Sequence, residues 1–366
     1  MRRPVSPGSP VVVKVGSSSL IGTDGGLDDG AVQSVVAHMV ALAEKGYPPV
    51  LVTSGSIAAG FPSLGMTHRP TDIAELQVAA AIGQTKLVER YAKQFADRGF
   101  AAAQVLLTKD VLGNRVQYLN ARAALDQMLG LGVIPVVNEN DTVAVDELKL
   151  GDNDQLAAIT AHLVGAGMLV ILTDTEGLFS DDPRLTSKAQ LLSAVEHNDE
   201  ILDRIRRATR TGVLGSGGVA TKVTAARMAA FSGIPTVIAD AAVTDVVVDA
   251  VGGVEVGTWI DPRPDSLSAR KLWIAFGLPT FGAITVDDGA VDAIRAGGAS
   301  LLAVGLTKTE GDFSRGDAVE VLDGSGALVA KGISRFGSDV LADTAGHHSD
   351  TIGGEVIHRD DLVVLR

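Results

Sequence analysis

Cysteine is absent from this chain of 366 residues, which excludes disulfide bonds and metal sites built from thiolates. Aromatic residues make up only 4%, and no apolar run approaches the roughly 18 residues needed to cross a membrane. Basic residues are also few: 31 Lys and Arg against 44 Asp and Glu give a net charge of −13, which disfavours broad affinity for nucleic acids or anionic membranes. We therefore expect a cytoplasmic protein without a membrane span. Any phosphate-binding site should be a small positively charged region within an otherwise acidic protein.

The length predicts two domains, and the composition changes along the chain accordingly. Residues 1–10 contain two arginines and three prolines but no apolar stretch, so we expect a flexible leader and not a signal peptide. Residues 11–257 alternate strand-like and helix-like runs and form the first predicted domain. Residues 258–280, with several Pro, Arg and Trp, are the predicted linker to a small β-rich domain at 281–366.

The alternation in the first domain predicts an α/β fold, with a largely parallel, doubly wound sheet sandwiched by helices. Sheets of this kind bind ligands outside the carboxyl ends of their strands. Polar turns follow several of the predicted strands and should therefore share one edge of the sheet. These turns come after Gly16, Thr53, Val137 and Thr173.

Two polar clusters lie on either side of the short segment 142–150. The first, residues 138–141, has the sequence Asn-Glu-Asn-Asp and follows an apolar run; the second, residues 151–154, is Gly-Asp-Asn-Asp and precedes an apolar helix. A turn followed by a helix cap explains either cluster alone, because Asp and Asn are good N-cap residues. Together they favour a site for a small zwitterion, with amides facing its carboxylate and carboxylates facing its ammonium.

Two lysines are candidates for binding phosphate. Lys14 interrupts an otherwise apolar strand; it either lies on an exposed edge strand or faces an anion at the strand's end, and we favour the second because an unpaired buried ammonium is costly. Residues 212–222 place four glycines and Lys222 around the start of a helix, where backbone N–H groups attract anions. A flexible surface loop is the alternative. We predict that both lysines converge on one phosphoryl group, with Asp154 holding them in place.

Other motifs are less consistent with this stretch. It is not a P-loop, because Lys222 follows Thr221 and precedes Val223. Residues 215–220 satisfy a dinucleotide-binding pattern, but no strand-like run precedes them as a nicotinamide dehydrogenase requires. Asp152 or Asp174 could bind magnesium, yet that ion relies on water and nucleotide oxygens, so its ligands stay unassigned.

With these residues in view, the chain resembles the glutamate 5-kinases of the amino-acid kinase family over almost its whole length. The resemblance implies transfer of the γ-phosphoryl group of ATP, with Mg2+, to the side-chain carboxylate of L-glutamate as the first step of proline biosynthesis. It also implies feedback inhibition by proline and a homo-oligomer. The matching segments are residues 13–18, 52–60, 137–141, 149–154, 172–178 and 215–222.

The resemblance also assigns roles by position. Lys14 and Lys222 would contact the phosphates, and Asp154 would orient both lysines. The residues that would hold glutamate are Ser54, Asp141 and Asn153, with Asn138 close by. Besides the two lysines, ATP would be held by Thr173, Asp174, Ser216, Gly217, Gly218, Val219, Ala220 and Thr221.

The β-rich segment at 281–366 resembles the PUA domain, and PUA domains elsewhere bind RNA. Here 14 Asp and Glu against 7 Lys and Arg give a net charge of −7, which disfavours contact with a phosphate backbone. His347-His348 is more consistent with a loop than with a metal site, because no further ligands accompany it. An RNA-binding protein without kinase activity, or a kinase acting on aspartate or acetylglutamate, are the remaining alternatives.

Overall fold

The computed structural model describes residues 2–22, 26–144, 153–210, 218–344 and 354–365, although the side chains of 206–210 and of 343 and 344 are not described. The chain divides into two compact units, Met1–Ser266 and Leu267–Arg366. The division falls inside the segment that we predicted as the linker. Among the helices of the described residues, none combines the length and the apolar character that a membrane span requires.

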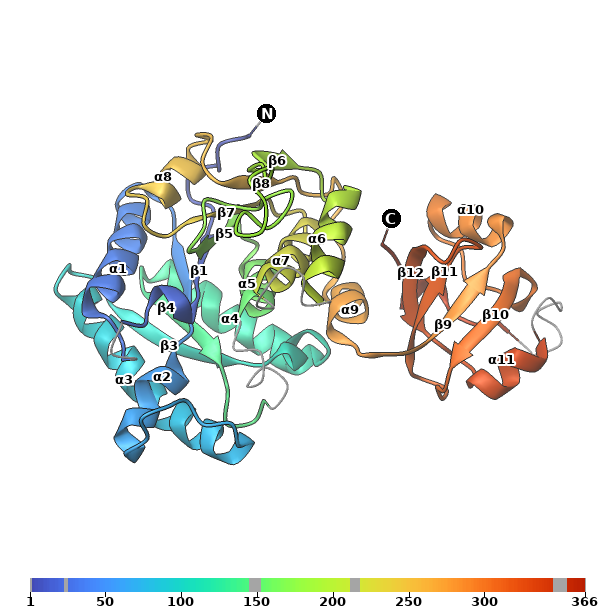
Figure 1. Cartoon of the computed structure of the whole chain (residues 1–366), viewed down its shortest axis with the longest axis horizontal. Coiled ribbons are helices and arrows are strands. Elements are labelled where there is room, and N and C mark those ends of the chain that lie inside the picture. The colour runs from blue at the N-terminus through green and yellow to red at the C-terminus, as the bar shows by residue number, and fades with distance from the viewer. Residues whose placement is uncertain (1, 23–25, 145–152, 211–217, 345–353, 366) are drawn as a thin grey trace. The chain divides into compact units, whose positions relative to one another are not determined.

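The first unit contains an eight-stranded sheet with the strand order β3-β4-β2-β1-β5-β7-β8-β6 (Figure 1). The pairings from β3 to β7 are all parallel, whereas β8 runs antiparallel to β7. This confirms the predicted fold class. The strands are β1 (Val11–Val15), β2 (Pro49–Val52), β3 (Ala102–Leu107), β4 (Ile134–Glu139), β5 (Met168–Thr173), β6 (Ala194–Val195), β7 (Thr236–Asp240) and β8 (Thr258–Ile260).

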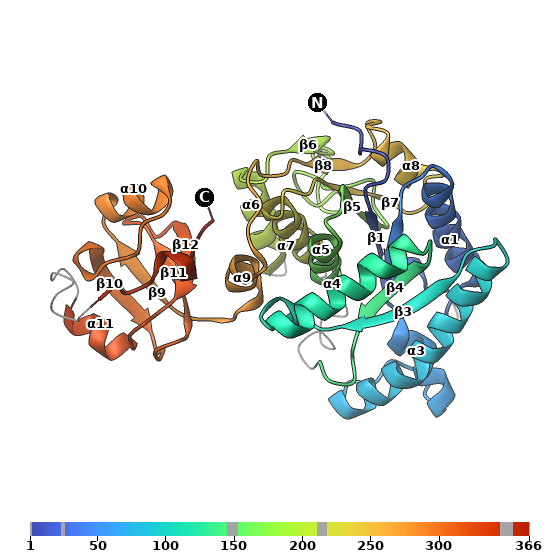
Figure 2. The same cartoon turned by 180° about the vertical axis from the view of Figure 1, so that it is seen from behind.

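Helices cover both faces of the sheet (Figure 1, and from behind in Figure 2). The apolar side chains of α1, α3 and α8 form one core with alternate residues of β1, such as Val13, while Lys14 faces the layer that contains α5. Helices α4 and α7 pack beside α5 in that second layer. The helices are α1 (Asp29–Glu44), α2 (Ser56–Gly60), α3 (Ile73–Ala96), α4 (Arg115–Gly130), α5 (Asp154–Val164), α6 (Glu200–Arg210), α7 (Gly218–Phe231) and α8 (Val246–Val251).

The described leader residues are packed against the first unit, which differs from the flexible leader expected from sequence. The Arg2 guanidinium donates to the carbonyl oxygens of Ser193 and Gly257, both at 2.8 Å. Val5 is buried, and its N–H donates to the Val251 carbonyl at 2.9 Å. Because these partners lie about 190 to 250 residues away in the chain, no local pattern could indicate them.

The second unit is a five-stranded sheet with the order β10-β9-β11-β12-β13. The apolar run at residues 300–304 predicts a strand, but these residues form an isolated bridge at Leu301 followed by a 3-10 turn. Strands β10 and β12 had not been predicted; β10 is mostly exposed and polar, so it lacks a clear alternating pattern. The elements are α9 (Ala269–Leu272), β9 (Thr280–Val286), α10 (Asp288–Ala296), β10 (Leu306–Gly311), β11 (Ala318–Leu322), β12 (Leu328–Ile333), α11 (Ser338–Thr344) and β13 (Leu362–Val364).

Candidate active site

Two lysines that are distant in sequence meet at one carboxylate. Lys14 Nζ lies 2.6 Å from Asp154 Oδ1, and Lys222 Nζ lies 3.2 Å from Asp154 Oδ2. The Thr221 hydroxyl donates to Asp154 Oδ2 at 2.9 Å. Lys14 is on β1, Asp154 begins α5, and Lys222 is in α7, so three elements place these charges at the carboxyl edge of the sheet.

The burial of this cluster explains why Lys14 is paired with a carboxylate. Lys14 is 1% exposed and Asp154 is fully buried, whereas Lys222 is 13% exposed and lies toward the surface. A buried ammonium requires a counter-charge, and Asp154 supplies it. A Cβ at Gly16 would lie 3.4 Å from Lys14 Nζ, so the glycine leaves space beside the ammonium. Two ammoniums and one carboxylate leave a net charge of +1, which suits a phosphoryl group.

A chain of amide side chains lies beside this cluster. Asn153 Nδ2 donates to the Thr53 carbonyl at 2.6 Å and to Asn138 Oδ1 at 2.5 Å. Asn138 Nδ2 in turn donates to Gln84 Oε1 at 2.6 Å, from a strand to helix α3. Ser54 is buried at the end of β2, and its hydroxyl has no hydrogen-bond partner among the described residues.

Asp141 brings a carboxylate to the same edge, just after β4. The Ser56 hydroxyl donates to Asp141 Oδ2 at 2.8 Å, which ties α2 to the loop after β4. Burial raises the pKa of Asp141, and the hydrogen bond from Ser56 and the nearby Arg69 partly oppose that shift. Ser56 and Gln84 were not predicted as site residues. Ser56 lies in a small-residue turn that offered a weak signal, and Gln84 lies in an Ala-rich helix that offered none.

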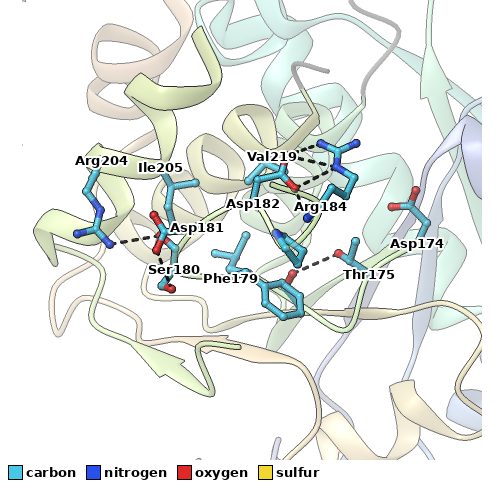
Figure 3. A pocket seen from close by; sticks show the side chains of 13 residues that line it. Asp174, Thr175, Phe179, Ser180, Asp181, Asp182, Arg184, Arg204, Ile205 and Val219 are labelled. Carbon is cyan, nitrogen blue, oxygen red and sulfur yellow. Dashed lines mark hydrogen bonds and ion pairs between the residues drawn. The ribbon is translucent and has the colours of Figure 1, made fainter. Parts of the chain in front are cut away.

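A cavity of about 400 Å³ opens beyond the end of β5 (Figure 3). Thr173 ends that strand, and its hydroxyl donates to Asp174 Oδ1 at 3.2 Å. Apolar walls come from Phe179, Ile205 and Val219, the last of which lies in the first turn of α7. The polar side chains of the lining are Asp174, Thr175, Ser180, Asp181, Asp182, Arg184 and Arg204.

The lining of this cavity combines apolar and charged side chains, a combination that is compatible with a nucleotide. An aromatic and two aliphatic side chains suit a base, and guanidinium groups suit phosphate or sugar oxygens. Asp182 and Arg184 form an ion pair at 2.7 Å within the lining. Of the predicted ATP-binding positions, Gly218 to Lys222 lie in α7, while Ser216 and Gly217 lie outside the described residues.

Among the described residues, no group of three or more acidic or histidine side chains is arranged so that it could hold a metal ion. Asp174 lies at the cavity but Asp152 falls outside the described residues, as does His347-His348. Magnesium commonly keeps several waters and relies on one or two carboxylates together with nucleotide phosphates. The donor set therefore fits Mg2+ only as an ion that enters with a nucleotide.

Comparisons with known proteins match both units. Residues 9–240 match the family model for the amino acid kinase family, and residues 282–355 match that for the PUA domain. A glutamate 5-kinase of Marinomonas sp. is 46% identical, with all of both chains covered. One from Nitrosococcus oceani is 45% identical, covering 97% of this chain and 96% of its own. The chain belongs to the glutamate 5-kinase family of amino acid kinases.

The family membership confirms the resemblance inferred from the sequence. A further glutamate 5-kinase, from Pseudomonas syringae pv. tomato, is 44% identical over the full length of both chains. Among solved structures, a UMP kinase from Bacillus anthracis covers 72% of this chain and 99% of its own, with a TM-score of 0.50 and 14% identity. At this identity the likeness supports the fold alone and carries no information on the substrate.

Proposed function

We propose that this chain transfers the γ-phosphoryl group of ATP to the side-chain carboxylate of L-glutamate, giving L-glutamyl 5-phosphate in the first step of proline biosynthesis. The observation that carries the proposal is the pairing of Lys14 and Lys222 with Asp154, next to an amide and carboxylate cluster. Relatives named glutamate 5-kinase, at 43% to 46% identity, support it.

The lysines perform most of the proposed chemistry by position and charge. Phosphoryl transfer needs the reacting oxygens in line and the charge on the transferred group neutralised, and it needs little covalent work from the protein. Lys14 and Lys222, fixed by Asp154, would neutralise that charge. Mg2+ bound with ATP would add charge neutralisation at the phosphates.

The amino acid would lie between the lysines and the polar side chains at the ends of β2 and β4. Asn153 uses both hydrogens of its amide in the contacts to Thr53 and Asn138, so it offers a ligand its Oδ1 acceptor. Asp141 offers a carboxylate to the ammonium group, and Ser54 offers a hydroxyl donor. Thr173, Asp174 and the start of α7 would hold ATP at the cavity beyond β5.

The deciding assay is release of ADP that depends on the amino acid. We expect turnover with L-glutamate and little with aspartate or acetylglutamate at equal concentration, with ATP saturating. The same enzyme without an amino acid gives the background. Preferential turnover of aspartate or acetylglutamate would replace this proposal with another carboxylate kinase of the family.

The same proposal extends to partners and location. We expect proline, as the end product, to inhibit glutamate-dependent turnover, and we expect a homo-oligomer in light scattering. In the described part of the chain β3 is the terminal strand of the sheet and carries the half-exposed Leu106, which is compatible with an assembly of copies. Because the reaction consumes ATP, it would take place in the cytoplasm.

The second unit would have a structural or regulatory role. Its acidic balance does not favour RNA, and the site residues named above all belong to Met1–Ser266. We expect a chain that ends at Ser266 to keep part of the glutamate-dependent activity. Complete loss of activity in a truncation that still unfolds cooperatively would contradict a peripheral role.

A further inference from the structure

Asn153, Asn138 and Gln84 form a hydrogen-bonded series of side-chain amides beside the lysines, and only one orientation of each amide satisfies these hydrogen bonds. The Thr53 carbonyl can only accept, so the group of Asn153 that faces it must be the amide nitrogen. That nitrogen also faces Asn138, which must therefore present its oxygen and turn its own nitrogen to Gln84. Reversing any one amide would place donor against donor or acceptor against acceptor. The backbone carbonyl of Thr53, the residue after β2, thus determines the orientation of the Gln84 amide on α3.

With the amides in this orientation, Gln84 Nε2 is the last donor of the hydrogen-bonded series Asn153, Asn138, Gln84. Gln84 is 8% exposed, and its Nε2 is buried without a hydrogen-bond partner among the described residues. An unsatisfied buried donor costs about 1–3 kcal/mol, and a ligand that accepts a hydrogen bond from it would remove that cost. The Ser54 hydroxyl is a second buried donor without a partner in that part of the chain.

A small cavity lies beside Gln84. It has a volume of about 220 Å³ between α3, the edge strand β3 and the residues after β4. Gln84 lines it together with Asp141 and Glu139, so an amide side chain and two carboxylate side chains border one space. A group that carries a carboxylate and an ammonium on the same carbon matches this combination.

The position of Gln84 indicates which carboxylate it serves. Gln84 comes from α3, on the opposite face of the sheet from the α5 layer in which Lys14 meets Asp154. The reacting carboxylate of the substrate must face the lysines. The other end of the amino acid, with its α-carboxylate and ammonium, is then the end that faces α3.

We propose that Gln84 is a substrate-binding residue whose Nε2 donates to the α-carboxylate of the amino acid, while its Oε1 keeps Asn138 and Asn153 in their binding orientation. This inference rests on the proposed function and specifies how the amino acid is recognised. It predicts selection against acceptors that lack an α-carboxylate. The probe is 4-aminobutanoate, which is L-glutamate without that group and retains both the ammonium and the reacting carboxylate.

The test compares kcat/KM for L-glutamate with kcat/KM for 4-aminobutanoate in the unmodified chain and in two variants. If turnover of 4-aminobutanoate is too slow to measure, its inhibition constant against glutamate is measured instead. Gln84→Glu keeps the oxygen that accepts from Asn138 and replaces the donor with an acceptor. Gln84→Met removes both and covers the case in which the buried charge prevents folding. Gln94→Glu is the control, because Gln94 lies on the same helix and its oxygen accepts from Arg98.

We expect Gln84→Glu to lower kcat/KM for glutamate about 10- to 100-fold, as loss of a hydrogen bond to a charged group does. The kcat/KM for 4-aminobutanoate, or its inhibition constant against glutamate, should change less than about threefold. Gln84→Met should also narrow the preference for glutamate, with the KM for ATP unchanged. Equal losses for both acceptors, or wild-type preference in both variants, would overturn the assignment of Gln84 alone. Absence of glutamate-dependent ADP release in the unmodified chain would instead overturn the proposed function, and this inference with it.

Discussion

Replacing Asp154 by Asn tests the central electrostatic arrangement. The substitution keeps the shape of the side chain but removes the charge that pairs with Lys14 at 2.6 Å and Lys222 at 3.2 Å. At an effective dielectric constant near 20, each contact corresponds to about 5–6 kcal/mol of attraction before desolvation is subtracted. Because Lys14 is 1% exposed, its ammonium stays buried after the change and loses its counter-charge.

Two measurable losses follow from Asp154→Asn. Breaking one side of a buried ion pair costs about 3–5 kcal/mol of unfolding free energy, measurable by urea denaturation. Misplaced phosphate-binding charges should lower kcat in the ADP-release assay about 100- to 1,000-fold. The control is Asp126→Asn, whose exposed pair with Arg122 at 3.7 Å should contribute less than about 1 kcal/mol. If Asp154→Asn retained wild-type kcat, the lysine pair would not be the phosphate site, whatever its effect on stability.

The remaining predictions concern the edges of the site. Lys222→Ala should lower kcat about a hundredfold with little change in unfolding free energy, since this lysine is partly exposed; unchanged kcat would refute its role. Gly83→Ala would place a Cβ 1.7 Å from the Ser56 carbonyl oxygen, so we expect a loss of about 1–3 kcal/mol in urea unfolding and a raised KM for glutamate; Gly130→Ala, which meets nothing within 4 Å, is the control. Burial raises the pKa of Asp141, so the folded protein loses stability from this carboxyl group as the pH rises through that pKa. Asp141→Asn should therefore be at least as stable as wild type at pH ~7. The same substitution should raise the KM for glutamate, and in the wild type that KM should rise as the pH falls through the raised pKa; a flat pH profile would show that Asp141 does not bind the ammonium.

The part of the site that was predicted from sequence is the part that parallel topology determines. Lys14 is the last residue but one of β1 and Thr173 ends the neighbouring parallel strand β5, so their place at one edge of the sheet follows once the alternation of strands and helices is recognised. The pairing of both lysines with Asp154 could also be expected, because a lysine within an apolar strand needs a buried counter-charge. Residues 211–217 remain outside the described part of the chain, so the glycine-rich phosphate loop stays a prediction.

What the sequence could not indicate depends on contacts between distant segments. Gln84 belongs to a helix whose Ala-rich pattern predicts only packing, and its role appears only when α3 lies against Asn138. Strand β8 has three residues inside the predicted linker, and it is defined by pairing with β7 and β6. Such short strands have no periodicity of their own, because two or three residues do not establish an alternation.

The small residues after β2 show how packing decides between two interpretations of one motif. Most of residues 54–60 are small, and such residues either let a backbone approach a ligand closely or make a tight connection from strand to helix. Gly55 has φ of +101°, which a residue with a side chain rarely adopts, so this position serves the turn. A Cβ at Gly60 would lie 1.8 Å from the Ala79 carbonyl oxygen, so Gly60 serves the close approach of α2 to α3. Because α2 carries Ser56, whose hydroxyl donates to Asp141, this glycine contact helps to position the carboxylate that we propose for the amino-acid site.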